Sequence, residues 1–208
     1  MNRLRDRLLL MGGEVELALQ RSLYALIKRD SPTVGRVLEH DRVIKRLKIE
    51  IDQLGIEVLA VQRPVEDDLR IAIAIIKLMP ILDRIADHAV SIARTALLLN
   101  DEPELRCYGK LDEMAGITLV MLQTALDTFT ESDSGKARLL IAKDEEVDRL
   151  YNNLVQEWMR TMSQDASQSA RLARFLFVAK HLERIGDYVK NICELTVYMK
   201  EAVFIKHM

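Results

Sequence analysis

Pairs of acidic residues spaced four apart are the groups in this sequence best suited to chemistry. Residues at this spacing lie one turn above each other on one face of an α-helix, so each pair directs two carboxylates the same way. Neighbouring carboxylates repel each other unless a cation lies between them. Each pair is therefore a candidate cation site, and the pairs are Asp83 with Asp87, Asp144 with Asp148, and Glu183 with Asp187.

The pair at Asp144 and Asp148 lies on an apolar helix face, where its neighbours are Ile141, Val147, Tyr151 and Val155. An acid in such a stripe is costly unless it is paired or bound to a cation. Oxygen ligands from two neighbouring helices suit hard cations such as Mg²⁺, Mn²⁺ or ferric iron. We therefore predict a metal site made by Asp144, Asp148, Glu183 and Asp187. The alternative is that these acids pair with arginines such as Arg149 and Arg184.

The elements that position these acids are predicted to be helices. Apolar residues recur at helical spacing along nearly the whole chain, with no sustained alternation of the kind that marks a strand. The chain has only 8 glycines and 4 prolines, and its hydrophobic fraction of 49% allows a sizeable core. The breaker residues divide the chain into six predicted helices, at about 2–29, 32–61, 67–99, 105–131, 135–162 and 168–202. Pro80 is expected to kink the third helix.

An internal repeat determines how these helices are grouped. The segment 82–88, Leu-Asp-Arg-Ile-Ala-Asp-His, recurs as Leu-Glu-Arg-Ile-Gly-Asp-Tyr at 182–188. Further upstream the offset becomes 103, so that Asp41 aligns with Asp144. A repeat of this length indicates a duplicated supersecondary unit. We predict an all-α fold of two tandem, homologous three-helix bundles, with the first unit at 1–100, a linker around Asn100–Pro103 and the second unit at 104–208.

Composition and charge limit the function. The net charge of −2 argues against nucleic acid as a partner, because nucleic-acid binding needs a basic surface. The longest apolar run, at 71–82, contains Lys77 and is too short to span a bilayer. Two cysteines, Cys107 and Cys193, suggest a reducing cytoplasm without a disulfide framework. We expect a cytoplasmic protein whose membrane association is peripheral and only through partners.

Motifs for catalysis are missing from the sequence. A carboxylate-bridged di-iron enzyme on a helical bundle needs Glu-x-x-His on two helices, and none of the 4 histidines follows a glutamate at that spacing. There is no nucleophile–base pair and no glycine-rich phosphate loop. We predict that the chain is not an enzyme and has no catalytic or cofactor-binding residues, and that it works by binding and regulating. A carboxylate-bridged di-metal enzyme and a metal-free helical adaptor are the alternatives.

The duplicated block at 82–87 and 182–187, the Met-Gly-Gly at 11–13 and the two-times-three-helix layout resemble the PhoU family. The resemblance covers nearly the whole chain. It implies a cytoplasmic negative regulator of the phosphate regulon and of phosphate uptake. Such a regulator acts with the ATPase of the phosphate ABC transporter and with a phosphate-sensing histidine kinase, and is often a homodimer. Some relatives bind iron or zinc through Glu/Asp-x-x-x-Asp motifs, which here match Asp144/Asp148 and Glu183/Asp187.

The first unit departs from this metal-binding pattern. Asp83 and Asp87 match it, and Asp41 matches its first position in the second helix. The position four residues after Asp41 is Lys45, and Lys48 and Asp52 share its face. A charged ammonium cannot ligate a metal, so Lys45 is predicted to enter the acidic site and pair with Asp83 or Asp87. Asp41, Asp83 and Asp87 are therefore the candidate ligands of a second metal site, which binds a metal weakly or not at all. Iron, zinc, manganese and magnesium all remain candidates for the metal.

Overall fold

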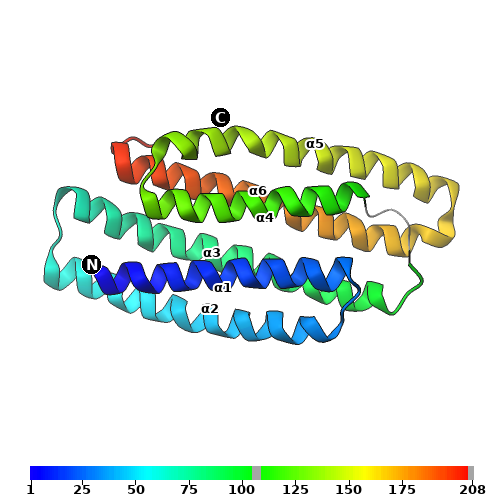
Figure 1. Cartoon of the computed structure of the whole chain (residues 1–208), viewed down its shortest axis with the longest axis horizontal. Coiled ribbons are helices and arrows are strands. Elements are labelled where there is room, and N and C mark those ends of the chain that lie inside the picture. The colour runs from blue at the N-terminus through cyan, green and yellow to red at the C-terminus, as the bar shows by residue number, and fades with distance from the viewer. Residues whose placement is uncertain (105–108, 206–208) are drawn as a thin grey trace.

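The computed structural model describes residues 1–104 and 109–205, and within these ranges it contains helices and no strands. The six α-helices lie side by side in two groups of three (Figure 1). In chain order they are α1 (Asn2–Ile27), α2 (Pro32–Glu57), α3 (Glu66–Asn100), α4 (Gly109–Glu131), α5 (Ser134–Gln164) and α6 (Ser169–Glu201). The prediction of an all-α fold of two three-helix bundles is confirmed. Residues 105–108, where the fourth helix was predicted to begin, lie outside the described residues, as do residues 206–208.

Local sequence explains where these helices begin. Pro32 occupies the first turn of α2, where its missing N–H costs nothing. The Asp133 side chain accepts a hydrogen bond from the Lys136 backbone N–H and so caps α5. Ser31 precedes α2, but its side chain makes no cap hydrogen bond. Its hydroxyl oxygen instead accepts from the Asn100 side chain at 3.1 Å, which ties the end of α3 to the α1–α2 turn.

The first unit has one irregular segment. The α-helical geometry of α2 ends at Glu57 and is followed by a π-helical turn at Val58–Gln62. Arg63 then adopts a left-handed conformation with φ of 46°, which ends the helical backbone before Pro64. The predicted helix end near 61 therefore falls inside the π-turn. Pro80 lies within α3, which continues through it as a helix.

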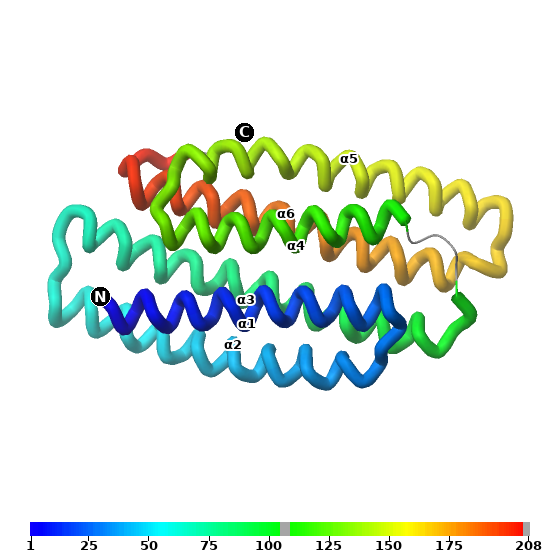
Figure 2. Tube along the Cα trace, in the orientation of Figure 1, coloured from blue at the N-terminus to red at the C-terminus, as the bar shows by residue number. Residues whose placement is uncertain are grey.

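The two bundles pack against each other, and α3 and α6 supply the main contact between them, with α1 against α4 beside it (Figure 2). Buried side chains from all six helices form one hydrophobic core. The largest fully buried side chains include Trp158 and Phe175 in the second unit and Leu4 and Met11 in the first. The acidic pairs of both units are thus held on rigid helices. No helix in the described part of the chain is both long enough and apolar enough to cross a membrane.

Candidate functional site

The second unit brings two of its acidic residues, Asp144 and Asp187, together around one lysine. α5 supplies Asp144 and Asp148, and α6 supplies Glu183, Asp187 and Lys190. The Lys190 Nζ lies 2.7 Å from Asp144 Oδ2 and 3.0 Å from Asp187 Oδ1. These are charge-assisted hydrogen bonds, which are roughly twice as strong as neutral ones. The ammonium group of Lys190 therefore joins α5 to α6.

Asp144 is the most constrained acid of this cluster. Its side chain is only 3% exposed. Burial raises the pKa of its carboxyl group; the hydrogen bond and charge of Lys190 oppose this, and the charges of Asp148 and Asp187 add to it. The Asp144 Oδ1 atom has no hydrogen-bond partner among the described residues, and it lies against the backbone of Gly186. Hydrogen bonds to Asp144 and Asp187 outweigh desolvation at Lys190 and raise the pKa of its ammonium group.

Glu183 and Asp187 of the second cluster also have cations on α6 itself. The Lys180 Nζ lies 2.7 Å from Glu183 Oε2, and a guanidinium nitrogen of Arg184 lies 3.8 Å from Asp187 Oδ2. Arg184 is one of the two arginines that the alternative to a metal site named as partners of these acids. Arg149 does not take this role, because its side chain donates to the Glu145 backbone oxygen.

The first unit forms an analogous cluster from α2 and α3. The Lys45 Nζ lies 2.6 Å from Asp83 Oδ1 and 2.7 Å from Asp87 Oδ1, as the sequence predicted. Lys48 binds the other oxygen of Asp83 at 2.7 Å, and Asp41 lies 3.8 Å from Lys45. Burial alone raises the pKa of Asp83, but the hydrogen bonds from Lys45 and Lys48 outweigh it and the net pKa is lowered. The same bonds raise the pKa of Lys45 against its own desolvation.

In each unit a lysine ammonium group therefore lies between two of the predicted metal ligands, Asp83 and Asp87 in the first unit and Asp144 and Asp187 in the second. Within the described ranges, no three histidine, cysteine, aspartate or glutamate side chains are arranged to hold a metal ion. In this structure the carboxylates of the two clusters are not placed to bind a metal ion. The two metal sites remain predictions. Sequence reasoning missed Lys190. Its position three residues after Asp187, one turn along the same helix, was the available signal.

Two histidines meet at the contact between the units. His88 on α3 and His181 on α6 share a hydrogen bond of 2.9 Å between their Nδ1 atoms. Burial lowers the pKa of His88 to about 4, with the charges of His181, Arg184 and Arg84 acting in the same direction and Asp87 opposing them. Burial also lowers the pKa of His181. The spacing of the histidines along the chain gave no sign of this contact, because His181 is 93 residues from His88 and only tertiary packing brings the two rings close.

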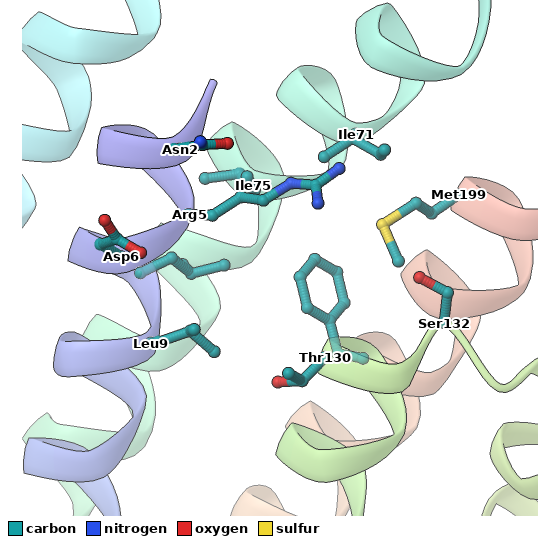
Figure 3. Close-up of a pocket in the computed structure, with 11 residues that line it drawn as sticks. Asn2, Arg5, Asp6, Leu9, Ile71, Ile75, Thr130, Ser132 and Met199 are labelled. Carbon is teal, nitrogen blue, oxygen red and sulfur yellow. The ribbon is translucent and has the colours of Figure 1, made fainter.

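A pocket of about 230 Å³ lies between the units and away from the charged clusters. It is bordered by the start of α1, by α3 and α6, and by the end of α4 (Figure 3). The Arg5 side chain extends across it toward Ile71 and Met199. Its walls are mainly apolar. No sequence motif indicated this pocket, because its lining comes from segments distant in the chain.

The fold and these clusters define a class of duplicated helical-bundle protein, in which charged side chains pair across helices of each bundle. The chain belongs to the PhoU domain family, whose model matches residues 8–96 and 111–196, one match in each unit. The resemblance inferred from the sequence is thus confirmed.

Curated relatives and solved structures agree with this family. The chain is 34% identical to the phosphate-specific transport system accessory protein PhoU homolog of Clostridium acetobutylicum, over 94% of this chain and 90% of the relative. It is 31% identical to the phosphate-specific transport system accessory protein PhoU of Escherichia coli K12, over 99% and 85%. The crystal structure of PhoU from Pseudomonas aeruginosa superposes with a TM-score of 0.94 at 34% identity, covering 97% of both chains. The phosphate transport system regulatory protein PhoU from Streptococcus pneumoniae gives a TM-score of 0.90 at 28% identity, covering 99% and 97%.

Proposed function

We propose that this chain is a cytoplasmic negative regulator of phosphate uptake and of the phosphate regulon. It acts with the ATPase of a phosphate ABC transporter and with a phosphate-sensing histidine kinase, and holds both in the state appropriate to ample phosphate. The observation that supports this most directly is the family match in each unit, together with relatives named as accessory or regulatory proteins of phosphate transport. Those names also support the prediction that the chain is not an enzyme.

A binding role suits the surface of the molecule. Leu10, Leu17 and Tyr24 are exposed on α1 and are spaced seven residues apart, so they form one apolar stripe along the helix. Exposed apolar stripes of this kind are typical of surfaces that bind a partner helix. We assign this stripe to partner binding, with the transporter ATPase, the kinase or a second copy of the chain as the partner.

The regulatory role is tested in a bacterial strain that lacks its own member of the family. The chain is expressed in that strain, and a reporter for a phosphate-starvation promoter is measured in phosphate-rich medium. We expect the chain to restore repression of the reporter and to lower phosphate uptake. A reporter that stays fully active, with the chain present at normal abundance, would contradict the proposed function.

The partners are tested with purified components. Binding of the transporter ATPase and of the cytoplasmic part of the kinase is measured by interferometry with the wild type and with a Leu10→Glu, Leu17→Glu variant. Leu139→Glu on α5 is the matched control, because Leu139 is 77% exposed and lies in the second unit. We expect the α1 variant to bind at least tenfold more weakly and the control to bind normally. Equal binding by all three proteins would remove the α1 stripe from the interface.

A further inference from the structure

We propose that each acidic cluster is closed by a lysine of the chain itself, Lys45 in the first unit and Lys190 in the second. In this view the ammonium group takes the place of a metal ion, and a divalent cation can enter only by displacing the lysine. This inference concerns the folded chain alone and does not depend on the proposed regulatory function.

The contacts place each ammonium group between two carboxylates of its cluster. Lys45 bonds to Asp83 and Asp87 at 2.6 and 2.7 Å, and Lys190 bonds to Asp144 and Asp187 at 2.7 and 3.0 Å. Mg²⁺ or Mn²⁺ would need those same oxygens at about 2.0–2.2 Å. A lysine and a metal ion therefore cannot occupy either cluster together.

The two lysines come from positions that do not correspond in the repeat. The counterpart of Lys45 at the offset of 103 is Asp148, and the counterpart of Lys190 at the offset of 100 is Val90. Each unit thus has one lysine between its paired acids, but α2 provides it in the first unit and α6 in the second. Because the two lysines come from different positions of the repeat, the lysine between two acids is not a by-product of the duplication.

The charge balance of both clusters also indicates that the lysine is needed. In the second cluster, Asp144, Glu183 and Asp187 pair with Lys180, Arg184 and Lys190, and the charge of Asp148, which acts on Asp144, is left in excess. In the first cluster, the three acids Asp41, Asp83 and Asp87 face Lys45 and Lys48, which again leaves one negative charge in excess. Removing the central lysine raises the excess to two and leaves acids of the cluster without their cation. Such a site is destabilised and becomes complementary to a divalent cation.

The test compares the wild type with Lys45→Met and Lys190→Met, which keep the length of the side chain and remove its charge. Each protein is incubated with excess Mn²⁺ and desalted, and its metal content is measured by mass spectrometry. Melting temperatures are recorded in EDTA and in Mn²⁺. We expect the wild type to retain less than a tenth of an equivalent of Mn²⁺ and to melt at the same temperature in both conditions. We expect Lys190→Met to melt about 5–15 °C lower in EDTA and to regain part of that loss in Mn²⁺.

A second variant keeps the test informative if Lys190→Met fails to fold. The double substitution Asp148→Lys, Lys190→Val gives the second unit the arrangement of the first. We expect it to melt within a few degrees of the wild type and to retain no Mn²⁺. A wild type that retains a full equivalent of Mn²⁺ and is destabilised by EDTA would overturn the proposal. So would Lys45→Met and Lys190→Met proteins that melt at the wild-type temperature in EDTA.

Discussion

The Asp144 carboxylate occupies the space that a Cβ atom on residue 186 would need. Gly186 on α6 lets the Asp144 Oδ1 atom approach its backbone, while the other oxygen of the same carboxylate binds Lys190. Ala86 stands at the equivalent position of the first unit, where the corresponding acid, Asp41, has a side chain that is 25% exposed. The glycine in the second copy of the repeated block is thus explained by a close approach between α5 and α6.

We expect Gly186→Ala to destabilise the protein by about 1–3 kcal/mol, since the methyl group must displace Asp144 from its position. Asp144 can rotate away only by weakening its bond to Lys190. Chemical denaturation gives the free energy of unfolding. Gly116→Ala is the control, because a Cβ there meets nothing within 4 Å. The control is expected to be neutral or to stabilise by up to about 1 kcal/mol. Equal stability of the two alanine variants would contradict this explanation.

The His88–His181 hydrogen bond predicts a loss of stability in acid. The folded state holds the pKa of His88 at about 4, below the value of 6.5 expected in the unfolded chain. The unfolded chain therefore binds more protons between these values, and the stabilisation present above pH 6.5 is lost as the pH falls toward 4. Because the His88 ring is only half-buried, solvent screening limits the effect to on the order of 1 kcal/mol.

This prediction is measured by urea denaturation of the wild type and of His88→Gln between pH 7 and pH 4. The variant is expected to lose less stability over that range, since glutamine does not titrate. NMR titration of the ring gives an independent value. A His88 midpoint above pH 6 in the folded protein would be incompatible with the buried, neutral pair.

Cys193 is expected to be inert in the folded protein. It is fully buried, and desolvation raises the pKa of its thiol to about 12, so that almost no reactive thiolate forms at neutral pH. Thiol labelling is measured in a Cys107→Ser background, which leaves Cys193 as the one cysteine. No labelling is expected in buffer and complete labelling in denaturant. Rapid labelling of the native protein would mean that α6 opens readily around Cys193.

The two units are expected to unfold together. Trp158, the one tryptophan, is buried in the second unit with its ring centroid 5.9 Å from that of Phe175, so its fluorescence reports on that unit. Circular dichroism reports on helices of both units. Because one core runs through all six helices, the two signals should give coincident denaturation curves. Separate midpoints would show that each bundle is an independent folding unit.

The helices and their grouping could be predicted from the sequence because they depend on local chemistry. Apolar spacing, breakers such as Pro32 and the repeated block at 82–88 and 182–188 each act within a few turns of the chain. The pairing of Lys45 with Asp83 was also predictable. Lys45 aligns in the repeat with Asp148 of the second unit. A lysine at a position where the other unit has an acid was expected to pair with the acids around it.

The contacts between distant segments were decided only by tertiary structure. The approach of Asp144 to Gly186, the choice of Lys190 over Arg149 as the partner of Asp144, and the bond between His88 and His181 all depend on how helices cross and rotate. The spacing of residues along one helix predicts which of them share a face. It does not predict which faces of two helices contact each other, because the packing of the whole core determines that.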